Sequence, residues 1–329
     1  MKVFILTEGG SVYGFGHITR CLSIYQAFLE KGITPQFIIN GDEKVKGYFN
    51  NIKYDLFDWT QDEHRLLKQI ESSDIVIIDT LLANLNLINK ICEYITIPVF
   101  IDDFRKLNYR RGVVLDWTIY AEERYLISNT VKYLLGSKFV ALRRAFWEVP
   151  MKIIKRDITE IVITMGGSDI RNLTPTILRN MNDIKANKFV IIGSGFVNFN
   201  EIESLVKEDK STKLIFNPSD NEIVNIFSKA DVAISASGQT LYELARIGTS
   251  TIAISIIDNQ KYDVEGWLKA EFIEYAGSWD DNDLMVNMRQ QYDNILFNFE
   301  NRKRKALIAQ SFVDGQGANR IVDALITMV

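Results

Sequence analysis

Several residue types are scarce in this chain of 329 residues, which has two histidines, two cysteines and five prolines. Cys21 and Cys92 are too few for a disulfide framework, and both lie in apolar stretches. We therefore expect buried thiols in a reducing compartment. The low proline content and the lack of low-complexity tracts argue against disorder. Any histidine chemistry is restricted to His17 and His64.

Long apolar runs and blocks of one charge are also missing. No stretch approaches the roughly 20 apolar residues of a membrane span, and residues 1–6 lack the form of a secretory signal, so we expect a cytoplasmic protein. The net charge is −4, and we expect no basic block of the kind that binds nucleic acid. Cys/His metal spacings and a P-loop are absent as well. We therefore expect no metal and no cofactor; the oligomeric state stays open.

Short apolar runs alternate with longer helical stretches, which is typical of βαβ units in an α/β protein with parallel sheets. Runs rich in Val, Ile and Phe predict buried strands. They span residues 2–6, 36–40, 75–79 and 99–102 in the first half, and 161–165, 189–192, 214–216, 232–235 and 251–256 in the second. Helical spacing predicts a helix over residues 17–31, closed by Gly32.

The strand pattern weakens after Leu115 and restarts beyond a mixed stretch, residues 143–156, that contains Pro150. We place the domain boundary there, which gives domains 1–148 and 149–329. The segment 280–329 reads as helical throughout, and its last helix is a candidate to pack back on the N-terminal domain.

The loop after the first predicted strand, Glu8-Gly-Gly-Ser-Val-Tyr-Gly-Phe-Gly-His17, opens a helix. Gly14 and Gly16 let a ligand approach the backbone closely, and a helix N-terminus favours anions. His17 stands at that helix start, where a histidine can remove a proton near neutral pH. The alternative is a polar cap in a structural turn. A dinucleotide fingerprint fits poorly, because Thr19 stands where its third glycine belongs.

Three loops of the second half also follow predicted strands. Met165-Gly-Gly-Ser-Asp169 can turn backbone N–H groups toward a phosphate, whereas Gly193-Ser-Gly-Phe196 is a weaker signal. Ser235-Ala-Ser-Gly-Gln-Thr-Leu-Tyr-Glu243 runs into a helix whose N-terminus would suit an anion. Thr240 and Glu243 also match a capping box, so Glu243 has a competing structural role.

Acidic residues follow strands at Asp79, Asp102 and Asp103. Any of them could orient His17 or bind a sugar hydroxyl. Each could equally be a turn former or a helix cap. His64 lies at the start of an amphipathic helix, in Asp62-Glu-His-Arg, and we expect it on the surface.

Taken in order, these loops resemble a known family. The motifs are Gly14-Phe-Gly-His-Ile-Thr-Arg-Cys-Leu22, Ile101-Asp-Asp103, Met165-Gly-Gly-Ser-Asp169, the stretch from Ser235 through Gly248 to Asp258-Asn-Gln260, and Val313-Asp-Gly-Gln-Gly-Ala-Asn-Arg320. They are similar to the UDP-2,4-diacetamido-2,4,6-trideoxy-β-L-altropyranose hydrolases of pseudaminic acid biosynthesis. That family is related to the N-acetylglucosaminyltransferase of peptidoglycan synthesis. The resemblance covers nearly the whole chain and implies the GT-B fold, in which two Rossmann-like domains face each other across a cleft that binds a UDP-sugar.

The resemblance also implies roles for single residues. The histidine that matches His17 activates water for attack on the anomeric carbon, and UDP leaves with inversion. The loop Ser237–Thr240 would hold the pyrophosphate and Glu243 the ribose, while Asn259 and Gln260 would face the sugar. The expected substrate-binding residues are Gly14, Gly16, Arg20, Asp79, Asp103, Gly167, Ser168, Ser237, Gly238, Gln239, Thr240, Glu243, Asn259 and Gln260.

The chain departs from the family at several positions. Asp116 and Thr118 stand where asparagines are usual, Thr249-Ser250 replaces a hydrophobic-Pro pair, and residues 280–304 look diverged. If Asp116 lines the sugar pocket, it would favour a hydroxyl or amine donor on the sugar.

Three other functions remain open. A GT-B glycosyltransferase of cell-surface glycan synthesis would show an exposed apolar or acceptor-shaped surface on the first half. A nucleotide-sugar binding protein would hold its ligand without turnover. A dehydrogenase is disfavoured by the broken fingerprint and would bind NAD.

Overall fold

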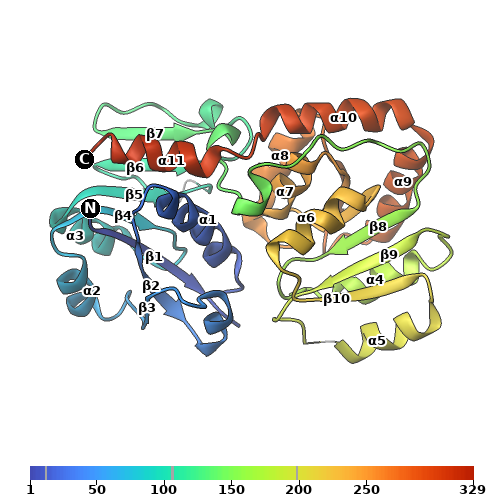
Figure 1. Ribbon diagram of the computed structural model, residues 1–329, viewed down its shortest axis with the longest axis horizontal. Helices are drawn as coiled ribbons and strands as arrows, with labels where there is room; N and C mark the ends of the chain where they lie inside the picture. The colour runs from blue at the N-terminus through green and yellow to red at the C-terminus, as the bar shows by residue number, and fades with distance from the viewer. Residues whose placement is uncertain (12, 105–106, 198) are drawn as a thin grey trace. The chain divides into compact units, whose positions relative to one another are not determined.

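The computed structural model describes residues 1–11, 13–104, 107–197 and 199–329. The chain forms two compact units. Unit 1 comprises Met1–Arg144 and Gly315–Val329, and unit 2 comprises Ala145–Asp314. Each unit is built on its own parallel sheet with helices packed against it (Figure 1). The predicted α/β class with two Rossmann-like domains is confirmed.

Unit 1 contains a seven-stranded sheet with the order β3-β2-β1-β4-β5-β6-β7. The strands are β1 (Val3–Gly9), β2 (Gln36–Gly41), β3 (Tyr54–Leu56), β4 (Ser73–Ile78), β5 (Ile95–Ile101), β6 (Gly112–Asp116) and β7 (Val131–Leu135). β1 and β4 are central, and β1 is buried along its whole length. This burial on both faces explains why their sequences are continuous apolar runs.

Most helices of unit 1 connect these strands, and the last one follows unit 2 in the chain. They are α1 (Gly16–Glu30), α2 (Glu63–Ile70), α3 (Leu85–Tyr94) and α11 (Gly317–Ile326), with short 3₁₀ turns at Glu43–Tyr48, Ala121–Arg124 and Ser137–Phe139. Gly32, with φ of +71°, follows α1, and its N–H donates to the Leu29 carbonyl at 2.9 Å, so the predicted helix end is confirmed. Asp62 caps α2 by accepting the Arg65 N–H. His64 is exposed, as expected.

The C-terminal helix α11 belongs to unit 1, where it packs beside α1 (Figure 1). At Gly317 a Cβ would lie 2.1 Å from the Val140 carbonyl oxygen, so only glycine fits. Arg320 donates to the Lys138 carbonyl at 3.0 Å. Helix α11 thus ties itself to the segment that follows β7.

Unit 2 contains a six-stranded sheet with the order β10-β9-β8-β11-β12-β13. The strands are β8 (Glu160–Thr164), β9 (Asn187–Ile192), β10 (Thr212–Phe216), β11 (Val232–Ala236), β12 (Ser250–Ser255) and β13 (Glu274–Ser278). Isoleucines of β8, β11 and β12, including Ile163, Ile234 and Ile252, form the centre of its core.

The helices of unit 2 are α4 (Leu173–Asn180), α5 (Phe199–Glu208), α6 (Asp220–Lys229), α7 (Thr240–Ile247), α8 (Lys261–Lys269), α9 (Leu284–Phe297) and α10 (Phe299–Phe312), with 3₁₀ turns at Arg144–Phe146 and Asp258–Gln260. Helices α9, α10 and α11 confirm that the chain is helical beyond residue 280 apart from short connections. In the described ranges, no helix has both the length and the apolar character needed to cross a membrane.

Four strands were not predicted, namely β3, β6, β7 and β13. β3 has only three residues, all half-buried. β7 and β13 lie at sheet edges, where Lys132, Glu274 and Gly277 interrupt the apolar run. Edge strands need less burial than central ones, so a search for continuous apolar runs overlooks them.

Candidate active site

The glycine-rich loop of unit 1 is a closed turn. Gly10 and Gly14 exchange backbone hydrogen bonds at 2.8 and 2.9 Å, and the Ser11 N–H donates to Asp42 at 2.8 Å. Gly10 has φ of +133°, and a Cβ there would lie 2.8 Å from the Asp42 carboxyl carbon. These contacts fix Gly10, Ser11 and Gly14 between the end of β1 and the first turn of α1.

Neither the backbone conformation nor packing within the protein requires glycine at position 16, the first residue of α1. The φ of Gly16 lies outside the left-handed region, and, apart from its chain neighbours and its own helix backbone, no atom of the described residues lies within 4 Å of the place where a Cβ would be. Gly14 differs, because its φ of +73° favours glycine by itself. Open space beside Gly16 at a helix N-terminus is what close approach by a ligand requires.

His17 and Asp79 form a hydrogen-bonded pair. Asp79 directly follows β4, and its N–H donates to the Leu6 carbonyl at 2.9 Å, which continues the strand pairing. Its buried Oδ1 lies 2.7 Å from Nδ1 of His17, whose side chain is 13% exposed. A carboxylate accepts from Nδ1–H, so the lone pair is placed on Nε2. An oriented imidazole with a free Nε2 is the arrangement of a general base.

Arg20, one turn further along α1, joins two carboxylates. Its Nε and Nη2 donate to Asp79 at 2.6 and 2.5 Å, and its Nη1 donates to Asp103 at 2.5 Å. Burial alone would raise the pKa of Asp79, but Arg20 and then His17 outweigh it and hold that pKa well below its ordinary value. The guanidinium also lies over the Trp117 ring, 5.5 Å from its centroid. Each nitrogen of Arg20 thus already donates within unit 1.

Of the three strand-end carboxylates predicted from the sequence, the structure brings Asp79 and Asp103 to Arg20. Asp102 is buried, and its backbone carbonyl accepts the Tyr125 hydroxyl at 2.8 Å. Successive residues after β5 thus face different surroundings, and the Ile101-Asp-Asp103 motif contributes Asp103 to this cluster.

Asp116 does not line an open sugar pocket, contrary to the possibility raised from the sequence. Its side chain is fully buried. Oδ1 accepts the Thr118 N–H at 2.9 Å and the Thr118 hydroxyl at 2.7 Å, and Oδ2 lies 2.8 Å from Arg124. Burial raises the pKa of Asp116 despite the Arg124 partner. Both oxygens are occupied, so the pair Asp116–Thr118 gives no reason to expect a different sugar.

In unit 2, the loops after β8 and β9 pack on each other. The Gly195 N–H donates to the Gly167 carbonyl at 3.0 Å, and a Cβ at Gly193 would lie only 2.3 Å from that oxygen. From the sequence, the 193–196 loop was the weakest candidate for ligand binding. In the structure, this loop supports Gly167 and Ser168. Asp169 is occupied too, because its carboxylate accepts the N–H groups of Leu173 and Thr174 at 2.9 Å each.

The loop after β11 leads into α7. Ser237 is fully buried, and its hydroxyl has no hydrogen-bond partner among the described residues. The φ of Gly238 lies outside the left-handed region, and a Cβ there would meet only Gln260 Nε2, at 3.5 Å. Like Gly16, Gly238 therefore has free space beside it at a helix N-terminus. An unpartnered hydroxyl and an open glycine are the features of an anion-binding loop.

The predicted capping box at Thr240 is wrong. Helix α7 begins at Thr240 with Gln239 in the cap position, and no side-chain cap hydrogen bond forms there. Glu243 is therefore the fourth helical residue, one position beyond the place that a capping box requires. Glu243 is buried.

Asn259 and Gln260 lie in the 3₁₀ turn after β12. Gln260 is buried, and its Oε1 accepts the Ile256 N–H at 2.8 Å. Its amide nitrogen is therefore the group that faces Gly238. Asn259 is half-buried in the same turn. The structure thus brings Gln260 to the Ser237–Thr240 loop.

The expectation of no basic block is wrong in one respect, because Arg302-Lys-Arg-Lys305 lies on α10. Lys303 lies 3.6 Å from Glu300, Arg304 lies 2.5 Å from Glu271, and Lys305 lies 2.6 Å from Glu274. The fourth, Arg302, is buried and donates to the Arg156 carbonyl. Each of these four cations thus has a partner within the protein. A surface that binds nucleic acid instead presents clustered cations to the phosphates.

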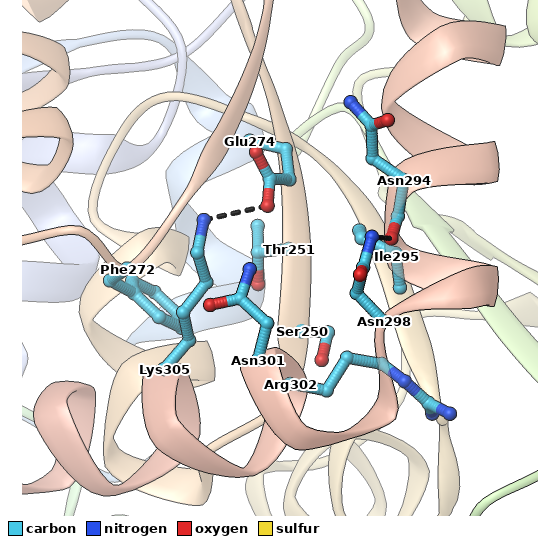
Figure 2. A pocket seen from close by; sticks show the side chains of 10 residues that line it. All are labelled: Ser250, Thr251, Phe272, Glu274, Asn294, Ile295, Asn298, Asn301, Arg302 and Lys305. Carbon is cyan, nitrogen blue, oxygen red and sulfur yellow. Dashed lines mark hydrogen bonds and ion pairs between the residues drawn. The ribbon is translucent and has the colours of Figure 1, made fainter.

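Figure 2 shows a small pocket in this region. Its lining comes from β12, β13, α9 and α10, and the Lys305–Glu274 ion pair lies on one side (Figure 2). The cavity has room for about one water molecule. It contains none of the predicted site residues, and a nucleotide does not fit it.

The sequence interpretation missed Glu8 and Trp117 as parts of the site. Glu8 is fully buried at the end of β1 and accepts hydrogen bonds from Thr80 and Leu81, the residues next to Asp79. The signal was present, because an acidic residue inside an apolar strand must find buried partners. No comparable signal marks Trp117.

No protein-family model matches the chain. An uncharacterised protein of Methanocaldococcus jannaschii is 25% identical in an alignment of 284 positions that covers 82% of this chain and 58% of that protein. The spore coat polysaccharide biosynthesis protein SpsG of Bacillus subtilis is 24% identical over 79% of each chain. A Helicobacter pylori protein, a pseudaminic acid cytidylyltransferase and UDP-2,4-diacetamido-2,4,6-trideoxy-β-L-altropyranose hydrolase, is 26% identical over 79% of this chain. The match spans 45% of that protein, less than half of its length.

Solved structures agree on the fold. MurG of Acinetobacter baumannii superposes over 99% of this chain and 100% of its own, with a TM-score of 0.67 and 14% identity. The UDP-GlcNAc 2-epimerase of Neisseria meningitidis, bound to UDP-GlcNAc, covers 99% and 100%, with a TM-score of 0.62 and 16% identity. The chain therefore has the GT-B fold and is a distant relative of sugar-processing proteins.

Proposed function

We propose that the chain is a nucleotide-sugar hydrolase that releases UDP from UDP-2,4-diacetamido-2,4,6-trideoxy-β-L-altropyranose. Water attacks the anomeric carbon, the bond to the diphosphate breaks, and the configuration inverts. The Helicobacter pylori relative carries this hydrolase in its name, and the reaction requires a base for water.

The observation that carries the proposal is the His17–Asp79 pair. A hydrogen bond of 2.7 Å to a buried carboxylate fixes the imidazole with Nε2 free. His17 accepts the proton of the attacking water at Nε2. Asp79 then stabilises the imidazolium, and Arg20 keeps Asp79 ionised. We assign Arg20 and Asp103 to holding this pair rather than to direct sugar binding.

The loops of unit 2 support nucleotide binding. Open space beside Gly238 and the unpartnered Ser237 hydroxyl at the start of α7 fit a diphosphate. Gln239 and Thr240 complete that helix start. Glu243 would bind the ribose, Asn259 and Gln260 the sugar, and the Gly167–Ser168 loop would add backbone N–H groups. In unit 1, Gly14 and Gly16 leave space beside His17 for the sugar.

The test is release of UDP from this nucleotide sugar without any acceptor. We expect turnover by the wild type and a loss of at least about 10²-fold for His17→Ala. His64→Ala is the matched control, because His64 is the other histidine and is exposed. No release by a wild-type protein that binds UDP tightly would refute the hydrolase.

One observation favours a second candidate, a glycosyltransferase with an apolar acceptor. The segments that follow three adjacent strands of unit 1, β4, β5 and β6, carry exposed apolar side chains. They are Leu81, Leu82, Leu85, Phe104, Leu126 and Ile127. Leu126 and Ile127 are 90% and 71% exposed. Exposed apolar side chains of this number in the segments after β4, β5 and β6 would suit an apolar acceptor.

The two candidates predict different outcomes for Leu126→Ser/Ile127→Ser. A hydrolase should keep its acceptor-free rate within about twofold, because neither side chain contacts the His17–Asp79 pair. A transferase would show slow acceptor-free release in the wild type, fast release with an apolar alcohol acceptor, and a raised KM for that acceptor in the double variant.

A further inference from the structure

Glu8 is a carboxylate buried without a cation. It is fully buried at the end of β1, and no Lys, Arg or His lies within ion-pair distance of it in the described parts of the chain. Its Oε1 accepts the Leu81 N–H at 2.6 Å, and its Oε2 accepts the Thr80 hydroxyl at 2.7 Å. Burying a charge in this way is costly unless its hydrogen bonds are short and specific. Both bonds go to the turn that follows β4.

The two bonds begin where the β1–β4 ladder ends. Leu6 pairs with Ile78, and the Asp79 N–H donates to the Leu6 carbonyl at 2.9 Å. Two residues later, where a continued parallel ladder would use the Glu8 backbone carbonyl, the Leu81 N–H bonds the Glu8 carboxylate instead. The Glu8 side chain thus holds Thr80 and Leu81, which lie beyond the last regular pair of β1 and β4.

The turn itself is closed through Thr80. Its hydroxyl donates to Glu8 and accepts the N–H groups of Leu82 and Ala83 at 2.9 and 3.2 Å. The backbone of Asp79 is therefore held by the ladder on one side and by Glu8 on the other. From this held backbone, the Asp79 carboxylate extends to His17 and Arg20.

We propose that Glu8 is a positioning residue that, through the Thr80–Leu81 turn, holds the Asp79 carboxylate against Nδ1 of His17 and so fixes the imidazole tautomer. The catalytic part of this inference rests on the proposed function. The tautomer part does not, because it concerns the free protein.

The test is the tautomer of His17, read from ¹⁵N chemical shifts of the ring nitrogens. With only two histidines, the spectrum is simple, and exposed His64 is an internal reference. We expect Nδ1–H in the wild type and a mixture of tautomers in Glu8→Gln, in which an amide replaces one of the two acceptor oxygens. We also expect kcat for UDP release to fall about tenfold with KM within about twofold.

Glu222→Gln is the matched control. The Glu222 carboxylate in unit 2 also accepts one backbone N–H and one hydroxyl, both from Ser219, at 2.8 and 2.7 Å. Its loss should leave the His17 tautomer unchanged. If Glu8→Gln does not fold, Thr80→Val removes the hydroxyl that Glu8 accepts and tests the same turn.

A folded Glu8→Gln or Thr80→Val protein with wild-type ¹⁵N shifts at His17 would overturn the inference. A tautomer mixture in Glu8→Gln, together with no UDP release by the wild type, would support the positioning role and refute the hydrolase. Normal UDP release and unchanged His17 shifts in the variants would refute the positioning role and support the hydrolase.

Discussion

Asp79 Oδ1 lies 2.7 Å from His17 Nδ1, although 62 positions separate the two residues in the chain. The carboxyl end of β4 and the N-terminus of α1 bring them together. This contact distinguishes His17 chemically from the exposed His64, because a buried carboxylate fixes the His17 ring.

The first prediction concerns Asp79→Asn. The amide is neutral and cannot stabilise the imidazolium, and it presents one acceptor where two oxygens are now used. We expect kcat for UDP release to fall by about 10²–10⁴-fold. Asp116→Asn is the control, because it neutralises another buried carboxylate of unit 1, one whose oxygens bond Thr118 and Arg124, and its turnover should stay within about threefold. Equal losses in both variants would contradict the role of Asp79.

The second prediction concerns acid stability. The pKa of Asp79 is lowered in the folded chain, since Arg20 and His17 outweigh burial. The unfolded state therefore binds the proton at higher pH, and this stabilisation is present above the unfolded pKa, about 4. It is lost as the pH falls toward the lower folded pKa. Urea unfolding at pH 7 and pH 3 should show a smaller change in the free energy of unfolding for Asp79→Asn than for the wild type.

The third prediction separates two glycines. A Cβ at Gly238 meets only Gln260 Nε2, at 3.5 Å, so Gly238→Ala should change the free energy of unfolding by less than about 1 kcal/mol. We nevertheless expect its Kd for UDP to rise at least about tenfold, because the methyl group would occupy space in the proposed nucleotide site. Calorimetry with UDP and urea unfolding measure the two effects.

Gly193→Ala is the opposite case. Its Cβ would lie 2.3 Å from the Gly167 carbonyl oxygen, so we expect a loss of roughly 1–3 kcal/mol in unfolding free energy. Unchanged UDP affinity in Gly238→Ala would remove the loop after β11 from the proposed nucleotide site.

The fourth prediction concerns the cysteines, which are both free and buried. Burial raises the pKa of Cys92 to about 11, and burial followed by Asp79 raises that of Cys21 well above its ordinary range. Thiolates are the reactive species, so the native protein at pH 8 should react with a disulfide reagent at least about 10²-fold more slowly than in urea. Rapid labelling of the native protein would show that one thiol is accessible.

The sequence predicted those parts of the fold that have strong local signals. Central strands such as β1 and β4 carry continuous apolar runs, Val3–Leu6 and Ile75–Ile78, because both faces are buried, and Gly32 ends α1 where its φ is positive. Edge strands such as β7 carry Lys132 within the strand, so periodicity did not identify them.

The candidate site also has some residues that a local sequence signal identifies and others whose contacts depend on the fold. Glycines and His17 at a strand–helix junction can be found by inspection, since their role is local. The partners of Arg20, namely Asp79 and Asp103, are set by how strands β4 and β5 lie side by side. A capping motif read from spacing alone misplaced the start of α7 by one residue.

Helix α11 has a consequence for how the chain is made. It completes unit 1, yet it follows all of unit 2 in the sequence. During synthesis, which proceeds from the N-terminus, every residue of unit 2 leaves the ribosome before α1 can meet α11. Until α11 is made, unit 1 is incomplete and the side of α1 that contacts α11 is uncovered, whereas unit 2 can already fold. The His17 site, which begins in the first twenty residues, sits in the unit that is completed last.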